Sequence, residues 1–161
     1  MRVPAWIERA RLSAAMNAFD ASPRAAALYQ SSAQDEGTVD GNDWSRIQRV
    51  SLSADGSTVL GYLSAKIDRD VRRVQELCAI SFEPDSVEWA IDLRGFVRDL
   101  VAEFEVVHWS AVADSPNAAM YRRAVERLGG RVVGRFSRGG RRLGGRIIDV
   151  EWYELLGRGG R

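Results

Sequence analysis

The sequence predicts an α/β fold in which helices flank a mixed β-sheet. Segments with alternating apolar residues, typical of strands, lie between segments whose apolar residues have helical spacing. The dipeptide Asp55-Gly56 separates two alternating segments, as in a β-hairpin. A nearly continuous apolar run at Glu105–Val112, typical of a strand buried on both faces, directly follows a helical pattern. Strands interleaved with helices in this way are typical of α/β proteins.

The N-terminal segment, residues 1–33, is expected to form two helices. Pro4–Phe19 carries apolar residues close to helical spacing, and Ser22-Pro23 is expected to begin a short second helix that ends at Tyr29. The acidic stretch Gln34–Asp43 contains glycine and has no period, so it is expected to be a loop. We therefore expect the two helices to flank the sheet.

Three strands and a helix are expected in the middle of the chain. The strands are Trp44–Ser53, Thr58–Ile67 and Val74–Phe82. The first two lie on either side of the predicted turn, and the third follows a charged bend. The helix is expected over Asp85–Phe104, where Asp85 and Glu88 have the spacing of a capping box.

The C-terminal part is expected to contain a helix, an arginine-rich hairpin and a final strand. The helix begins near Ser115 or Asn117, either of which is a good N-cap residue, and it ends at Gly129-Gly130. The hairpin segment Arg131–Arg146 leads into the final strand Arg146–Leu156. The chain thus ends with two antiparallel strands that follow a helix.

The length and composition predict one domain. A chain of 161 residues with 45% hydrophobic and 28% charged residues is typical of a single globular domain. We expect residues 1–161 to form it, with the core sheet and helices at 44–156 and a Gly/Arg-rich tail at 157–161. No apolar run reaches the ~20 residues that span a bilayer, so no membrane partner is expected.

The counts of cysteine and histidine narrow the chemistry. Cys78 is the only cysteine, which excludes an intrachain disulfide and favours a reducing, cytoplasmic location; within its predicted strand it is expected to be a core residue. His108 is the only histidine, and no carboxylates are spaced around it as in a zinc site, so no metal is expected. Because histidine ordinarily titrates near neutral pH, His108 is either a candidate catalytic base or a satisfied histidine of the core.

Charge is divided unevenly along the chain. Residues 121–161 carry eleven arginines and four acidic residues, a net charge of +7, whereas residues 1–120 carry a net charge of −6. The basic residues concentrate in the predicted hairpin, which includes Arg138, Arg141 and Arg142. Such a surface could bind nucleic-acid phosphate, a cofactor phosphate or an acidic partner, or it could be a solvated loop.

Several short motifs occur in an order that resembles one family. In chain order they are Gly61-Tyr62, Phe82, Asp92-Leu93 or Asp99-Leu100, Asn117–Tyr121, Gly129-Gly130-Arg131 with Gly134, and Asp149 with Tyr153-Glu154. Together with the predicted element order, they make Val50–Leu156 resemble the GNAT family of acyl-CoA-dependent N-acyltransferases. The resemblance is greatest to a divergent GNAT-like group found in phage and prophage genomes.

The resemblance implies a mixed, largely antiparallel twisted sheet whose two central parallel strands splay apart. By position these strands are Val74–Phe82 and Glu105–Val112. In the family, the pantetheine arm of acyl-CoA lies between them, and the acyl group passes to an amine. The resemblance therefore implies that Ile80, Phe82 and Asn117 contact acetyl-CoA or another acyl-CoA, although an N-cap role explains Asn117 equally well.

The resemblance also implies catalytic residues. In the family, a tyrosine on the later helix gives a proton to the thiolate. The matching position here is Val125, and Tyr121 lies one turn earlier on the same helical face. Tyr121 is thus either a displaced general acid or a packing residue. Glu83, at the end of a splayed strand, and His108 are the candidates for deprotonating the amine.

The segment Phe82–Trp89 departs from the family pattern. The family binds the diphosphate of CoA on a glycine-rich loop at a helix N-terminus, where free N–H groups and the helix dipole favour an anion. Here the segment contains no glycine and carries Glu83, Asp85 and Glu88. Asp85 is expected to cap the helix. These carboxylates weaken the prediction of ordinary acetyl-CoA binding.

Two functional hypotheses follow from the sequence. The first is a GNAT-like N-acyltransferase that moves an acyl group from acyl-CoA to an amine. The second is a non-catalytic GNAT-like phage protein with a structural or partner-binding role, in which the basic hairpin contacts nucleic acid. A location in the host cytoplasm or in a virion fits the second hypothesis, and a homo-oligomer is compatible with both.

Overall fold

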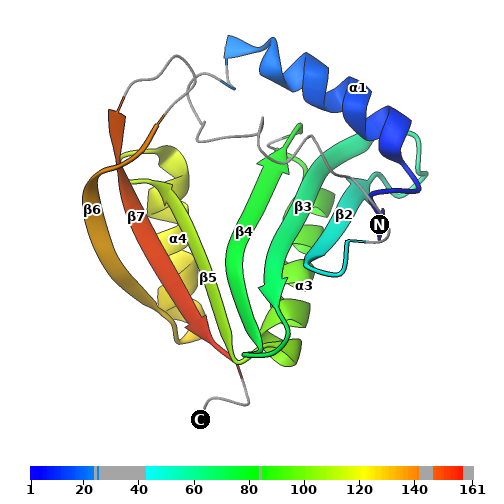
Figure 1. Cartoon of the computed structure of the whole chain (residues 1–161). Helices are drawn as coiled ribbons and strands as arrows, with labels where there is room; N and C mark the ends of the chain where they lie inside the picture. The colour runs from blue at the N-terminus through cyan, green and yellow to red at the C-terminus, as the bar shows by residue number, and fades with distance from the viewer. Residues whose placement is uncertain (24, 26–42, 84, 142–146, 158–161) are drawn as a thin grey trace.

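The structure is a computed structural model that describes residues 1–23, 25, 43–83, 85–141 and 147–157 (Figure 1). The strands are β1 (Arg2–Pro4), β2 (Arg46–Leu52), β3 (Val59–Asp68), β4 (Arg73–Ser81), β5 (Val106–Val112), β6 (Arg131–Arg141) and β7 (Ile147–Leu156). The helices are α1 (Arg9–Asp20), α3 (Val87–Glu103) and α4 (Pro116–Leu128). None of these helices has the length and apolar content needed to cross a bilayer.

The strands form one mixed sheet in the order β1-β2-β3-β4-β5-β7-β6. All neighbouring pairs are antiparallel except β4 and β5, which are parallel and are connected through α3. The predicted α/β fold with a mixed, largely antiparallel sheet is therefore confirmed. The hairpin turn at Gly56 is also confirmed, since its φ of 71° is the left-handed conformation that glycine adopts without strain.

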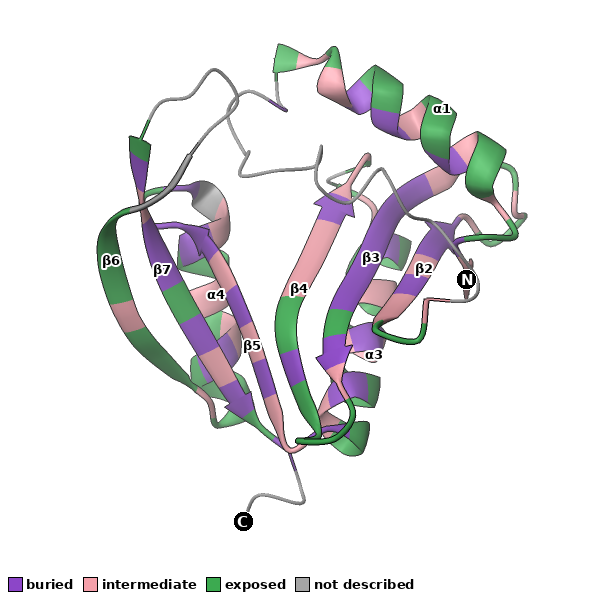
Figure 2. Ribbon diagram, in the orientation of Figure 1, coloured by how far each residue is buried: buried purple, intermediate pink, exposed green. Residues whose placement is uncertain are grey.

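Helices cover the two faces of the sheet unequally (Figures 1 and 2). On one face, α3 and α4 pack over a core cluster that includes Leu100, Val107, Val125 and Tyr153. On the other face, α1 packs over β2, β3 and β4 in a second cluster. In the described residues, β6 at the sheet edge is mostly exposed, whereas β3 in the middle is mostly buried (Figure 2).

The parallel strands β4 and β5 pair only at their beginnings. The register joins Arg73 to Val106 and Val74 to Val107, and no further pair follows among the described residues. Beyond these pairs the two strands diverge toward their C-terminal ends (Figure 1). The splay that the family resemblance implied is therefore present, and the next residue on β5, His108, lies where it begins.

The beginning of the chain differs from the prediction. Arg2–Pro4 forms the edge strand β1, which pairs with β2, and α1 begins at Arg9 and not near Pro4. Apolar spacing alone could not show this, because a three-residue strand has no measurable period. Of the predicted second helix, Ser22, Pro23 and Ala25 are described, Ser22 as a bend and the other two as helical. The rest of this helix and the acidic loop before Asp43 lie outside the described residues.

The predicted capping box at the start of α3 is wrong. Ser86 is the N-cap, and its hydroxyl accepts a hydrogen bond from Trp89 N at 3.1 Å. Asp85 is exposed, and Glu88 turns away to accept a hydrogen bond from Ala54 N at 3.1 Å. Serine and aspartate are nearly equal N-cap residues, so the sequence could not choose between two adjacent ones.

Gly157, the first residue of the predicted Gly/Arg tail, packs against the residues between α3 and β5. Its N–H donates to the carbonyl of Glu105 at 2.7 Å, and a Cβ at this position would collide with the carbonyl of Phe104. The close approach of the two backbones requires glycine here. The remainder of the predicted Gly/Arg tail, residues 158–161, lies outside the described residues.

Candidate functional site

The candidate site is built on the splay between β4 and β5. Within the described part of the chain, two buried side-chain polar atoms have no hydrogen-bond partner: Ser81 Oγ on β4 and Trp109 Nε1 on β5. Buried polar atoms are nearly always paired, so each orphan needs an explanation, and an absent ligand is one. One orphan atom therefore lies on each of the two strands that diverge.

Tyr121 of α4 packs into an aromatic cluster beside these strands. Its ring makes edge-to-face contacts with Trp109 and Tyr153, with centroids 5.9 Å and 5.6 Å away, and the latter two rings stack at 5.4 Å. Burial raises the pKa of Tyr121 to about 12, and the nearby Cys78 of β4 adds to this shift. The hydroxyl is therefore protonated at neutral pH, which is the form that can donate a proton.

The start of α4 positions this tyrosine. Ser115 is the N-cap and accepts a hydrogen bond from Ala118 N at 3.3 Å, with proline at the first turn. Of the two predicted caps, Ser115 is thus correct, and half-buried Asn117 lies inside the helix. Val125 is fully buried in the core cluster, so the position that holds tyrosine in the family is occupied here by a packing residue.

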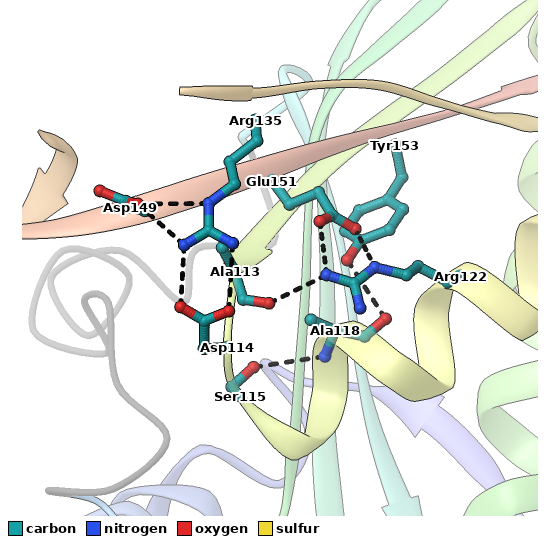
Figure 3. A network of polar contacts seen from close by, with 9 residues as sticks. All are labelled: Ala113, Asp114, Ser115, Ala118, Arg122, Arg135, Asp149, Glu151 and Tyr153. Atoms are coloured by element: carbon teal, nitrogen blue, oxygen red, sulfur yellow. Dashed lines mark hydrogen bonds and ion pairs between the residues drawn. The ribbon is translucent and has the colours of Figure 1, made fainter. Parts of the chain in front are cut away.

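Polar contacts hold α4 against β7 (Figure 3). Arg122 makes two hydrogen bonds of 2.7 Å to the carboxylate of Glu151, and these bonds hold the pKa of Glu151 below its ordinary value. The Tyr153 hydroxyl donates to the carbonyl of Ala118 at 3.3 Å. Desolvation first, then the contact with Glu151, raises the pKa of Tyr153 well above its ordinary value. These contacts fix the helix that carries Tyr121.

A second arginine joins β6 to the loop before α4 (Figure 3). Arg135 donates to both carboxylate oxygens of Asp114, at 3.1 and 2.9 Å, and to Asp149 at 3.2 and 2.9 Å. The hydrogen bond from Arg135 holds the pKa of Asp149 below its ordinary value. One arginine of the basic hairpin is therefore engaged in ion pairs with other residues of the chain, although it lies on the surface.

His108 contacts a carboxylate on the face of the sheet opposite α3 and α4. Its Nε2 lies 2.8 Å from Glu154 Oε2, and Glu154 Oε1 accepts a hydrogen bond of 2.7 Å from Arg131. The His108 contact first, and then Arg131, holds the pKa of Glu154 below its ordinary value. The sequence predicted His108 as a candidate but missed Glu154 and Arg131, because their contacts depend on the pairing of β5, β7 and β6.

The other predicted site residues do not join Tyr121. Ile80 is 2% exposed and packs under α1 together with Phe82, whose ring meets Phe19 edge-on at 5.8 Å. Their side chains are therefore core, and any cofactor contact would be through their backbone. Glu83 is exposed just after β4. It lies at the open end of the splay and not beside the aromatic cluster.

The predicted anion-binding hairpin is described only in part. Arg138 is exposed with a φ of 59°, and its backbone N–H donates to Asp149 at 3.1 Å. Arg141 ends β6, and Arg142 lies outside the described residues. Binding of nucleic acid by this hairpin stays a prediction. In the described ranges, no group of three histidine, cysteine or acidic residues is arranged to hold a metal ion.

Comparison with solved structures finds the same arrangement in acetyltransferases. A protein from T. thermophilus described as an acetyltransferase matches with a TM-score of 0.62 and 17% identity, over 96% of this chain and 84% of its own. Another protein described as an acetyltransferase has a TM-score of 0.65 and 19% identity, over 91% and 81%.

The spermidine N-acetyltransferase of Vibrio cholerae, solved with CoA and spermine, has a TM-score of 0.58 and 18% identity, over 71% of this chain and 68% of its own. No family model and no curated protein matches the sequence. The likenesses are therefore structural. Together with the parallel pairing that ends after two residues on β4 and β5, they show that this chain has the GNAT acetyltransferase fold.

Proposed function

We propose that the protein is an N-acyltransferase that moves an acyl group from acyl-CoA, such as acetyl-CoA, to a primary amine. The observation that carries this proposal is the protonated hydroxyl of partly buried Tyr121, whose ring packs against Trp109 of β5, beside two strands that splay apart. A protein with only a structural role has no need of diverging central strands, because each unpaired backbone group there loses a hydrogen bond.

The residues fit the acyl-pantetheine end of the cofactor. The edges of β4 and β5 beyond Val74 and Val107 offer backbone donors and acceptors to an amide-containing arm. The orphan atoms Ser81 Oγ and Trp109 Nε1 add one hydroxyl and one N–H donor on the same two strands. When bound, acyl-CoA supplies a thioester whose carbonyl carbon is open to attack by an amine.

The residues fit the diphosphate end less well. In the described structure, the Ser86 hydroxyl takes only the Trp89 N–H, so the N–H groups of Val87 and Glu88 remain available at the start of α3. Exposed Glu83 and Asp85 lie just before these groups and oppose an anion. We therefore expect acetyl-CoA to bind, with an affinity reduced by the two carboxylates.

Tyr121 is the proposed proton donor to the leaving thiolate. Its raised pKa keeps the proton in place until a strong base forms beside it, and a thiolate is such a base only in a desolvated site. The acceptor amine needs a base on the other side of the reacting carbon. His108, on β5 where the splay begins, and Glu83, after β4, are the candidates.

The acceptor is proposed to be a small primary amine. This part of the proposal is supported by the structural neighbours, among which the Vibrio cholerae protein is a spermidine N-acetyltransferase. Spermidine is therefore the first amine to test, and n-butylamine tests whether a single amino group suffices. The non-catalytic alternative predicts that neither amine is acetylated and that acetyl-CoA does not bind.

Calorimetry with acetyl-CoA tests the proposal directly. We expect a Kd below about 1 mM, which corresponds to ~4 kcal/mol. Ser81→Ala removes the orphan hydroxyl and is expected to weaken binding roughly two- to tenfold, the value of one hydrogen bond. Ser137→Ala, on the exposed strand β6, is the matched control and leaves the Kd unchanged. A titration that shows no heat at millimolar acetyl-CoA would refute the enzymatic function.

A further inference from the structure

Three side chains form a row across β5, β7 and β6. His108 lies opposite Glu154 in the register of β5 and β7, and Glu154 lies opposite Arg131 in the register of β6 and β7. Opposed residues point to the same face of a sheet. Their chain neighbours Trp109 and Tyr153 belong to the core cluster under α3 and α4, so the row points to the opposite face.

The contact with Glu154 determines which nitrogen of His108 carries the proton. An ionised carboxylate only accepts hydrogen bonds, so Nε2, 2.8 Å from Glu154 Oε2, must be an N–H donor. Arg131 binds the other carboxylate oxygen at 2.7 Å, which together with His108 holds the pKa of Glu154 below its ordinary value and keeps it ionised. In neutral His108, the lone pair is therefore on Nδ1.

Within this row, Glu154 is held firmly in the middle, whereas His108 at one end is more accessible to solvent. The side chain of Glu154 is 12% exposed and is held from both sides, whereas that of His108 is 22% exposed. No hydrogen bond to Nδ1 is made by the described residues. A half-buried imidazole with one nitrogen fixed by a carboxylate and the other nitrogen unprotonated has the properties of a general base.

His108 also has the correct place in the sheet for such a base. It directly follows Val107, the last residue of β5 that pairs with β4, so it lies at the inner end of the splay. Tyr121, the proposed proton donor, belongs to the cluster on the other face of the sheet. The two groups thus approach the splay from opposite faces, as required when one deprotonates the nucleophile and the other protonates the leaving group.

We propose that Glu154 is a positioning residue that holds His108 with Nδ1 ready to accept a proton from the acceptor amine, and that Arg131 keeps Glu154 ionised. The inference rests on the proposed acyl transfer. As the C–N bond forms, the amine nitrogen loses one proton to Nδ1; the C–S bond breaks, and Tyr121 gives its proton to sulfur. Glu154 stabilises the imidazolium, and exchange with water restores both side chains.

The single histidine makes the proton position directly measurable. In protein labelled with ¹⁵N-histidine, under conditions in which the imidazole is neutral, we expect its one N–H on Nε2, protected from exchange with water by its hydrogen bond to Glu154. Glu154→Ala is expected to abolish this protected signal. Glu126→Ala, an exposed carboxylate on α4, is the matched control and keeps it. A protected proton on Nδ1, or an Nε2 signal that survives in Glu154→Ala, would overturn the proposal.

Kinetics with acetyl-CoA and spermidine test the catalytic consequence. We expect Glu154→Ala to lower kcat roughly 10- to 100-fold, part of the full value of a general base, with the KM for acetyl-CoA unchanged. Arg131→Gln removes only the outer contact and is expected to lower kcat less. Glu154→Gln keeps the side-chain size, so it separates loss of the charge from a packing defect if the alanine variant does not fold.

Acyl transfer and the positioning role of Glu154 can be refuted independently of each other. If acetyl-CoA does not bind in calorimetry while the protected Nε2 proton is present, the proposed acyl transfer is wrong and the geometry of His108 is right. If acetyl-CoA binds and spermidine is acetylated, but Glu154→Ala and Glu154→Gln keep the full kcat, the positioning role of Glu154 is wrong and acyl transfer stands.

Discussion

Arg122 and Glu151 form a bidentate ion pair that joins α4 to β7, with two N–O distances of 2.7 Å. Glu151 is only 4% exposed, so its charge depends on this partner for its stabilisation. Arg122 also donates to the carbonyl of Ala113 at 3.2 Å. Because Arg122 follows Tyr121 directly, the pair holds the helix that carries the proposed proton donor.

Removal of one partner is therefore expected to cost more than removal of both. Arg122→Gln leaves the carboxylate of Glu151 buried without a cation, whereas Arg122→Gln with Glu151→Gln leaves two neutral amides. We expect the single variant to have the lower melting temperature, measured by circular dichroism. Arg131→Gln, which breaks a contact of a 71% exposed arginine, is the control and should lower the melting temperature less. Equal melting temperatures for the single and double variants would contradict this.

The pH dependence of stability follows from the same contacts. The ordinary pKa of 4.5 is lowered in folded Glu151, mainly by its hydrogen bond from Arg122, and in folded Glu154, mainly by its contact with His108. A group whose pKa is lower in the folded state stabilises the fold above its unfolded pKa and loses this contribution as pH falls through the folded value. We expect the melting temperature to fall below about pH 4.5, and less steeply in Glu151→Gln than in the wild type.

The sequence predicted the sheet better than it predicted the caps and ends. Strands β5 and β7 come nearest to the period-two burial pattern of a sheet with one buried side, whereas β3 is buried along most of its length. Gly56 and Gly129 adopt the left-handed conformations of a turn and of a helix end. The edge strand Arg2–Pro4 is too short to have a pattern. The N-cap Ser86 stands next to an aspartate that is equally suitable by type. N-cap preferences distinguish suitable from unsuitable residue types, but they cannot choose between two suitable residues that are adjacent in the sequence.

In the candidate site, too, the sequence could suggest some residues and not others. Tyr121 and His108 could be named as candidates because each is a rare or chemically distinct residue in a recognisable element, and their catalytic roles stay predictions. Glu154 and Arg131 could not, because the contact with His108 exists only when β7 lies between β5 and β6. That strand order inverts the chain order of β6 and β7. Side chains brought together by such long-range pairing leave no spacing in the sequence that would predict their contact.

Of the two glycines after α4, only Gly129 has a positive φ, yet we expect substitution of Gly130 by alanine to destabilise the fold more. Gly129 has a φ of 74° with open space around a new Cβ, so Gly129→Ala should cost about 1 kcal/mol, the backbone strain alone. At Gly130 a Cβ would collide with the backbone carbonyl of Glu154 and would meet the side chain of Leu155. We expect Gly130→Ala to destabilise more, by ~1–3 kcal/mol in urea denaturation. A smaller loss at Gly130 would show that β7 moves away easily.

The carboxylates before α3 are expected to weaken acetyl-CoA binding. Glu83 and Asp85 are exposed and precede the N–H groups of Val87 and Glu88, which have no acceptor among the described residues. Glu83→Gln with Asp85→Asn should tighten the Kd roughly two- to fivefold at low salt, the size expected for exposed charges, and this gain should shrink at about 0.5 M salt. Glu126→Gln on α4 is the matched control. An unchanged Kd in the double variant would mean that the diphosphate lies elsewhere.

The position of Tyr121, the proposed proton donor, gives the last prediction. Tyr121→Phe keeps the ring contacts with Trp109 and Tyr153 and removes only the hydroxyl. We expect it to retain the wild-type melting temperature and acetyl-CoA affinity and to lower kcat for spermidine about 10- to 100-fold. Val125→Tyr places a tyrosine where the family has one, but Val125 is fully buried, so overpacking should destabilise the protein by ~1–3 kcal/mol.

The double variant Tyr121→Phe with Val125→Tyr then tests whether a tyrosine at the family's position, one turn after Tyr121, can supply the proton. If the core around Val125 is as closed as its burial indicates, the new hydroxyl cannot reach the splay, and kcat stays low. Recovery of the wild-type kcat in the double variant would show that the family position remains functional. Full activity in Tyr121→Phe alone would show that the thiolate is protonated by another group, since phenylalanine has no proton to give.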